Sequence, residues 1–242
     1  MQKAKTSNNT GLYAWVQAAC CLLAVGVAIV AYSPRTQRAA LSEPTSTVQA
    51  ELEVVLVDES VDPLATQVEP QLPTGVALLT EYVGLDKRYR HYARLVLQRD
   101  ESFEQALTRL EPWLATLRLP SGARLGWQRQ APGQYRSYLL SGPAVFTARD
   151  VRTVEVTANH KNLFTTSIRL HPGVTEVVRQ FTRAHRGESM AIIVNGLVLT
   201  APRIQAEISN GMLQIAPGGD NPDRTRQSAE AFVKELTTAT HQ

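Results

Sequence analysis

The stretch from Met190 to Pro202, MAIIVNGLVLTAP, carries the clearest fold signal in this 242-residue chain. Its two apolar runs flank the dipeptide Asn195-Gly196, and both of these residues tolerate the positive φ angles that a two-residue turn requires. The stretch therefore predicts a β-hairpin. The side chains that we expect to face the core are Ile192, Val194 and Val198.

The residues that follow the hairpin extend this pattern. Ala201-Pro202 should end the second strand, because proline cannot donate a backbone hydrogen bond. The next segment, RIQAEISNGMLQIAP, predicts another extended pair around Asn210 and Gly211. Gly211 would allow a second tight reversal, and Ile204 would face the core.

Helical spacing of apolar residues appears on both sides of this region. Residues 174–185 place Val174, Val177, Val178, Phe181 and Ala184 on one stripe, which is typical of a helix packed on a sheet. Gly187 is a suitable helix stop. Residues 221–237 predict a terminal helix, which begins at a cap formed by Asp220 or Asn221.

The upstream segments predict more strands and one further helix. Residues 152–158 and 164–170 read as one hairpin, and residues 123–130 and 134–141 read as another. Residues 91–98 alternate as a half-buried strand does. Residues 102–117 predict a helix with a capping box made by Ser102 and Gln105, and Pro112 should kink or end it near its middle.

The N-terminal stretch Leu12 to Tyr32 contains no charged residue. About 20 apolar residues are enough to cross a bilayer as a helix, whereas the apolar core of a signal peptide has about 7 to 15. We therefore expect a transmembrane anchor over residues 12–32. It contains Cys20 and Cys21, the only cysteines, so no disulfide framework is available elsewhere.

The charges beside this span do not fix its orientation. Lys3 and Lys5 precede it, and Arg35 and Arg38 follow it, so the positive-inside rule gives a tie. A short tail followed by the bulk of the protein is the layout of a signal anchor. This layout predicts a cytoplasmic tail over residues 1–11, a single pass through a bacterial inner membrane, and a periplasmic C-terminal domain.

The net charge of +3 conceals three unlike regions. Residues 33–81 are acidic and rich in Pro, Ser and Thr, which predicts a mostly extended or disordered stalk. Only residues 52–57, LEVVLV, look like a strand or a docking segment there. Residues 82–140 contain ten Arg and Lys against five Asp and Glu. We interpret this basic α/β region as a solvated Arg-rich surface and not as a nucleic-acid site, because no nucleic-acid-binding motif accompanies it.

No pattern in the sequence demands catalysis. The five histidines are spread singly, so no zinc motif is present, and no Gly-x-Ser-x-Gly elbow occurs. Residues 217–223, PGGDNPD, fit a turn and helix entry better than a phosphate or calcium loop. Glu176 and Glu188 would be candidates for an enzyme acting on envelope polymers, but solvated helix and loop charges explain them better. We therefore expect no enzyme, no cofactor and no metal.

From Leu140 to Ala216 the order of elements and the motifs xAIIVNG, xVLTAPxI and IxxGxxxI resemble the head subdomain of the first periplasmic domain of SecD and SecDF. Those proteins assist export through the Sec translocon. The resemblance implies that residues 141–242 form a SecD head-like domain with a C-terminal helix. The fold class would be α+β, with a mixed or antiparallel sheet backed by helices. The residues that match the family motif, all with structural roles, are Ile192, Val194, Asn195, Gly196, Val198, Ala201, Pro202, Ile204 and Gly211.

The resemblance implies a binding role and not a motor. The predicted span has no charged residue, and proton-coupled export needs ionisable groups within the membrane. Our leading hypothesis is a membrane-anchored, non-catalytic periplasmic module that contacts a translocon component or an exported polypeptide. The alternative is a structural or accessory subunit of an envelope complex that reuses the head fold without a role in secretion.

Overall fold

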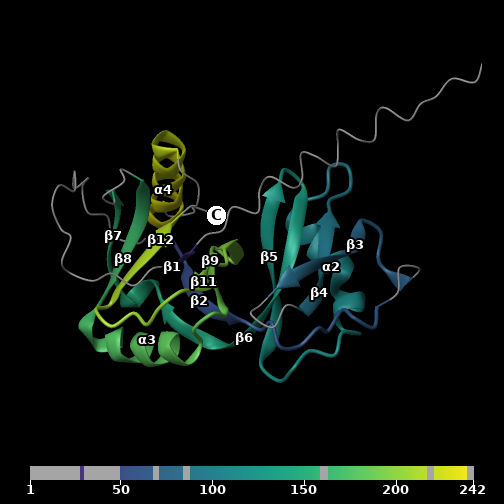
Figure 1. The fold of residues 1–242 in the computed structure, drawn as a ribbon. Helices are drawn as coiled ribbons and strands as arrows, with labels where there is room; N and C mark the ends of the chain where they lie inside the picture. Colours follow the sequence, from purple (N-terminus) through teal and green to yellow (C-terminus); the bar gives the residue numbers. More distant parts are fainter. Residues whose placement is uncertain are drawn as a thin grey trace, which may run out of the picture.

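The computed structural model describes residues 28–29, 50–67, 71–83, 88–158, 163–216 and 221–238. Within these ranges the strands join into one 12-stranded sheet, which three α-helices cover (Figure 1). The strand order is β3-β4-β6-β2-β9-β11-β1-β12-β8-β7, with β10 paired to β9 and β5 paired to β6. The expected α+β class, a mixed sheet with helices, is confirmed.

In chain order, the strands and helices are β1 (Ala28–Ile29), β2 (Leu52–Val57), β3 (Val76–Val83), β4 (Arg88–Val96), α2 (Phe103–Leu114), β5 (Ala123–Ala131), β6 (Gln134–Thr147), η3 (Ala148–Asp150), β7 (Val151–Ala158), β8 (Phe164–Leu170), α3 (Pro172–Ala184), β9 (Ser189–Val194), β10 (Leu197–Thr200), β11 (Arg203–Ile204), β12 (Met212–Ala216) and α4 (Pro222–Thr237).

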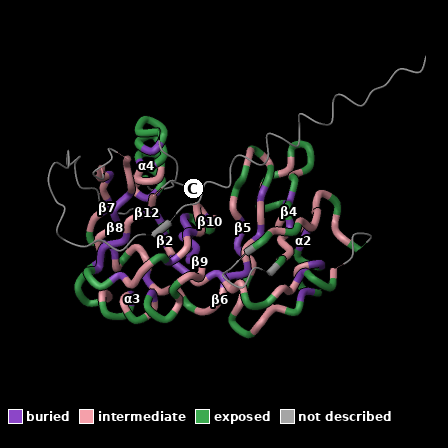
Figure 2. Tube along the Cα trace, in the orientation of Figure 1, coloured by how far each residue is buried: buried purple, intermediate pink, exposed green. Residues whose placement is uncertain are grey.

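The sheet is divided into two lobes (Figure 1). We call the part built from β3, β4, α2, β5 and the first half of β6 the N-lobe, and the part built from β7 to β12, α3 and α4 the C-lobe. Each lobe has its own buried core, and Figure 2 shows buried segments in both. A third cluster lies between them and consists of Val55, Val57, Leu140, Ala191, Ile193 and Val198.

Strand β6 runs from one lobe into the other. Its pairing with β2 changes register, because Leu56 lies opposite Ser141 while Val54 lies opposite Phe146. The extra residues of β6 form a bulge at Gly142, whose φ of 75° is one that glycine adopts without steric cost. A bulge bends its strand, so β6 turns here from the N-lobe toward the C-lobe.

The predicted hairpins are confirmed, and the one over residues 190–202 is built as its sequence indicates. Asn195 and Gly196 have φ angles of 48° and 78°, and β9 and β10 pair on either side of them. The motif side chains that were expected to face a core are buried: Ile192, Val194, Val198 and Ile204. Pro202 separates β10 from β11, as predicted.

The helix predicted around Pro112 is confirmed, but Pro112 does not break it near its middle. The capping box of Ser102 and Gln105 is present, and α2 continues to Leu114. Pro112 lies in the last turn, where its ring removes only one backbone hydrogen bond. The helix therefore tolerates it and ends two residues later.

The predicted stripe of α3 is wrong at two positions. Val177 is 55% exposed, and Ala184 is also exposed. Thr182 is buried in their place: its hydroxyl donates to the Val178 carbonyl at 2.8 Å and accepts from the Ile208 N–H at 2.9 Å. A polar side chain can face a core when its hydrogen bonds are satisfied, and apolar periodicity cannot detect this.

The extended pair predicted around Gly211 is arranged differently. The reversal is present, since Gly211 has a φ of 66°. However, β11 pairs with β9 and β1, and β12 pairs with β8 and β1, so β1 lies between the two strands. Ala28 and Ile29 are thus strand residues here and not part of a helix, because they pair with both neighbours. The other residues of the predicted span over 12–32 lie outside the described residues.

The prediction of a flexible stalk over residues 33–81 is wrong for its described part. The strand predicted at residues 52–57 is confirmed, but it lies in the middle of the sheet, between β6 and β9. Leu64 is buried in the N-lobe core, and β3 forms the edge of that lobe. The acidic composition of this region pointed to a stalk, but its apolar residues, such as Leu52, Val54 and Leu64, are buried in the fold. Among the helices that the structure describes, none is long and apolar enough to span a membrane.

Two neighbouring valines of α3 test this packing. Val178→Ala should lower the free energy of unfolding by about 2 kcal/mol, because it removes buried apolar atoms and leaves a cavity. Val177→Ala should change it by less than about 0.5 kcal/mol, because that side chain is exposed. Urea unfolding followed by circular dichroism measures both values. Equal losses from the two variants would contradict the packing described for α3.

Candidate binding site

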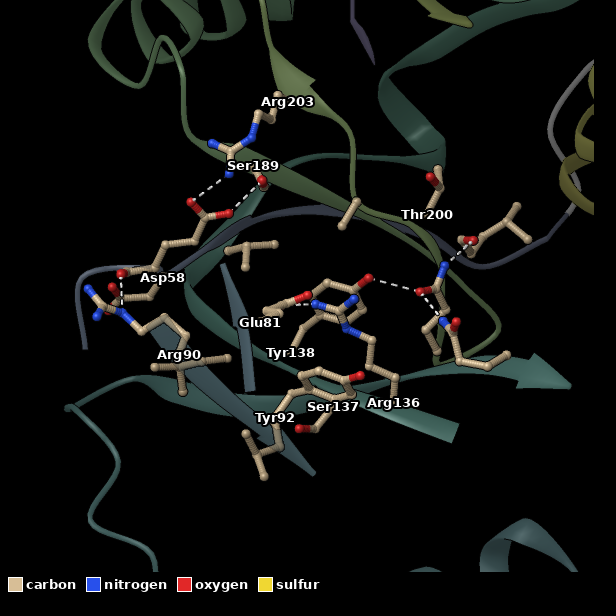
Figure 3. A pocket seen from close by; sticks show the side chains of 18 of the residues that line it. Asp58, Glu81, Arg90, Tyr92, Arg136, Ser137, Tyr138, Ser189, Thr200 and Arg203 are labelled. Carbon is tan, nitrogen blue, oxygen red and sulfur yellow. Dashed lines mark hydrogen bonds and ion pairs between the residues drawn. The ribbon is translucent and has the colours of Figure 1, made fainter. Parts of the chain in front are cut away.

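A cavity of about 760 Å³ lies between the two lobes (Figure 3). The N-lobe contributes the face of its sheet that is turned away from α2. The C-lobe contributes β9 to β12 and one side of α4, and the loop after β2 closes one end. The main residues that line the cavity are Asp58, Glu59, Leu64, Glu81, Arg90, Tyr92, Arg136, Tyr138, Leu139, Ser189, Leu199, Thr200, Arg203 and Phe232.

Strand alternation explains why this face is polar. On β4 and β6, residues Ala93, Leu95 and Tyr135 pack with α2 in the N-lobe core. Successive side chains of a strand point to opposite faces, so the residues between them point away from α2. Tyr92 and Arg136 are two of these, and both line the cavity.

Arg136 is the central cation of the cavity. Its guanidinium carbon lies 4.5 Å from the ring centroid of Tyr92 and 4.6 Å from that of Tyr138, so it contacts both rings. Such cation–π contacts are favourable and are stronger where water is excluded. The two tyrosines therefore hold the guanidinium in place.

Glu81 on β3 forms an ion pair with Arg136 through Oε1. Its side chain is 27% exposed. Burial raises the pKa of Glu81 above its ordinary value, and this effect outweighs the neighbouring Arg136 guanidinium, which lowers it. Burial likewise raises the pKa of Tyr138.

A chain of hydrogen bonds links this site to the C-lobe. The Tyr138 hydroxyl donates to Gln128 Oε1 at 2.8 Å, and Gln128 Nε2 donates to the Leu199 carbonyl of β10 at 3.0 Å. The cavity wall is therefore continuous from β6 through β5 to β10.

A second polar network closes the opposite end. Glu59 accepts from the Ser189 hydroxyl at 2.7 Å and pairs with Arg203 at 3.4 Å. Arg90 Nε donates to the Glu59 carbonyl at 2.8 Å. His91 Nδ1 lies 2.8 Å from Asp62 Oδ2 beside it. Three segments that are far apart in sequence are joined here by charged side chains.

The residues that were singled out from sequence have mainly structural places. Of the family-motif positions, Ala201 lines the cavity, and Ile192, Val194, Val198 and Ile204 belong to the buried clusters. Glu176 lies on α3 outside the cavity, where hydrogen bonds from Arg179 and Gln180 lower its pKa to about 2. Glu188 pairs with His185 at 3.3 Å. Among the residues that the structure describes, no group of three potential ligands could hold a metal ion.

Sequence reasoning did not find the cavity residues. Glu81, Tyr92 and Arg136 come from three strands, and only the sheet brings them together. The available signal was the alternation of Arg and Tyr on two strands, at residues 90, 92 and 94 and at residues 136 and 138. That pattern indicates one polar sheet face, but it does not say what covers the face.

The fold and the cavity together define a two-lobed α+β domain with a polar, aromatic-lined cleft. Residues 125–230 match the family model of the SecDF P1 head subdomain. The predicted resemblance to that subdomain is thereby confirmed, and it begins earlier than expected, within β5. Arg136 and Tyr138 belong to the matched part, whereas Glu81 and Tyr92 precede it.

Solved structures with some likeness to the chain are also SecDF proteins. One, described as a membrane component that enhances protein export, is 17% identical with a TM-score of 0.36, and the alignment covers 79% of this chain and 64% of that one. SecDF in a super-membrane-facing form is 16% identical, with a TM-score of 0.37 and coverage of 83% and 24%. SecDF from Thermus thermophilus, a translocon-associated membrane protein, is 14% identical, with a TM-score of 0.35 and coverage of 81% and 30%. This chain thus spans less than two thirds of each. A search of curated proteins gave no significant match.

The burial of Glu81 predicts a pH-dependent stability. The pKa of Glu81 is higher in the folded protein than its ordinary value of 4.5. As the pH rises above 4.5, the Glu81 carboxyl therefore stays protonated in the folded state while it loses its proton in the unfolded state. The free energy of unfolding of the wild type should therefore fall relative to Glu81→Gln as pH rises through this window. Urea unfolding at several pH values above and below 4.5 measures the difference. A difference between the two proteins that is constant with pH, or that changes in the opposite direction, would contradict this assignment.

Proposed function

We propose that this protein is a membrane-anchored, periplasmic and non-catalytic binding module that assists protein export or the assembly of envelope proteins. In this proposal a polypeptide segment binds in the cavity between the lobes. The observation that supports it most is the cavity itself, whose wall includes β-strands of the part that matches the SecDF P1 head.

The chemistry of the cavity suits a polypeptide. Its volume of about 760 Å³ is in the range of small-ligand pockets, which would accommodate a few residues of an extended chain. The lining combines apolar residues, such as Leu139 and Phe232, with tyrosine rings and charged side chains. A surface of this mixed kind can contact many sequences weakly, which is what transient handling of an emerging chain requires.

The titles of the similar structures support the cellular role. They describe SecDF as a membrane component that enhances protein export and as a translocon-associated membrane protein. We transfer only this general setting to the present chain. The predicted span over residues 12–32 would place the module at a membrane, and the partner would be a translocon component, an exported polypeptide or an envelope complex.

The non-catalytic part of the proposal is supported by the contacts of the acidic side chains Glu59 and Glu81 in the cavity, which pair with other residues of the chain. Glu81 pairs with Arg136, and Glu59 pairs with Arg203 and accepts from Ser189. These contacts join strands and loops to one another. We therefore assign these residues to shaping and charging the cavity.

Two exposed valines allow a matched test in cells. Val61 lines the cavity and is 40% exposed, whereas Val177 lies on α3 and is 55% exposed. A photo-crosslinking amino acid at position 61 should capture a translocon subunit or a newly exported polypeptide, and the same group at position 177 should capture much less. Mass spectrometry of the crosslinked products identifies the partners.

Recovery of only unrelated partners from position 61 would contradict the role in export. Deletion of the gene then separates the alternative role. Normal secretion together with a defect in envelope architecture would favour an accessory subunit of an envelope complex.

A further inference from the structure

We propose that Arg94 and Arg136 together bind a carboxylate of the polypeptide, so that the cavity prefers segments with an acidic side chain among aromatic or apolar ones. This inference rests on the proposed function and specifies the class of segment that the cavity takes. It starts from the polar face of the N-lobe sheet, which forms one wall of the cavity (Figure 3).

The two arginines face each other across neighbouring strands. Arg94 of β4 is the direct antiparallel partner of Arg136 of β6. Directly opposite residues of an antiparallel pair extend from the same face, with Cβ atoms about 5 Å apart, and like charges in this arrangement repel. An anion beside the pair would remove that repulsion. Arg94 is not one of the residues that line the cavity, but it extends the face that Arg90 and Tyr92 begin, because residues at alternate positions of a strand point the same way. It lies next to Arg136 on that face.

The guanidinium of Arg136 has unused donors. Glu81 takes one terminal nitrogen, and the rings of Tyr92 and Tyr138 both contact the guanidinium. Its Nε is buried and has no hydrogen-bond partner. A buried N–H without a partner costs free energy, so the site is poised to gain an acceptor.

Arg94 is available from the solvent side. Its side chain is exposed, and among the described residues the structure gives it no hydrogen bond or ion pair. The other acids of the cavity do not reach this pair: Glu59 is engaged with Ser189 and Arg203, and Asp58 accepts from Ser60. Glu81 pairs with Arg136, and no carboxylate among the described residues pairs with Arg94.

A carboxylate on a polypeptide fits this site better than a lipid headgroup does. Arginine binds carboxylates with a planar fork of two hydrogen bonds, and the tyrosine rings beside it offer apolar contact to neighbouring side chains. The cavity also lies between two lobes, where a single chain segment can enter but the flat surface of a bilayer cannot.

The test uses the full chain in detergent and two fluorescein-labelled peptides, AYLELYA and AYLQLYA, followed by fluorescence anisotropy. The Glu peptide should bind about tenfold more tightly than the Gln peptide, which is the usual size of one charge-assisted contact. Arg94→Gln and Arg136→Gln should each bring this ratio close to one. Arg129→Gln is the matched control, because Arg129 is an exposed arginine on the opposite face of the same sheet, and it should leave the ratio unchanged.

Since Arg136 packs against two tyrosine rings, its variant is compared with Arg94→Gln, whose exposed side chain can be changed without loss of packing. Equal binding of the two peptides by the wild type would overturn the carboxylate preference and leave the proposed contact with polypeptide intact. Failure of both peptides to bind would also overturn it, while crosslinking from position 61 reports on the proposed function separately. If phosphatidylglycerol vesicles bind through Arg94 while the peptides are not distinguished, the pair recognises lipid and the proposal is wrong.

Discussion

The pairing of β2 with both β6 and β9 is the interaction on which the rest of the structure depends. Every residue of β2 has a register partner on β9, and β6 pairs with its other edge. Both faces of the strand are buried as well. Leu52 and Val54 belong to the C-lobe core, whereas Val55 and Val57 belong to the cluster between the lobes. This six-residue strand thus joins the C-lobe core to the cluster between the lobes.

The cavity follows from this constraint. The loop that leaves β2 carries Asp58 and Glu59 to its edge, and Glu59 reaches Ser189 and Arg203 of the C-lobe. The hydrogen bonds of Gln128 to Tyr138 and to the Leu199 carbonyl close the other side. These contacts link the two lobes on both sides of the polar cleft. The cation–π contacts of Arg136 add a preformed cation to it.

Local sequence signals predicted much of this fold because they act over a few residues. The Asn195-Gly196 turn, the Ser102 capping box and the Asn221 cap each depend on neighbours in the chain, and each is present.

The long-range arrangement of the strands could not be predicted in this way. The composition around β2 is acidic and rich in Pro and Thr, and this hid a strand whose partners lie about 90 and 140 residues further along the chain. The site was hidden for the same reason, because Glu81, Tyr92 and Arg136 meet only when three strands pair. Thr182 shows that apolar periodicity also misses buried polar residues, since its burial depends on a hydrogen bond from the Ile208 N–H.

Hydrogen–deuterium exchange at β2 tests the central claim most directly. If β2 is the shared central strand, the amides of Leu52 to Val57 should exchange as slowly as those of Ser189 to Val194 in β9, because both strands open only when the sheet does. Exchange of the β2 amides at the rate of an unstructured chain, with β9 still protected, would contradict the account. In that case residues 52–57 would belong to a stalk, and the two lobes would lack the strand that holds the cavity between them.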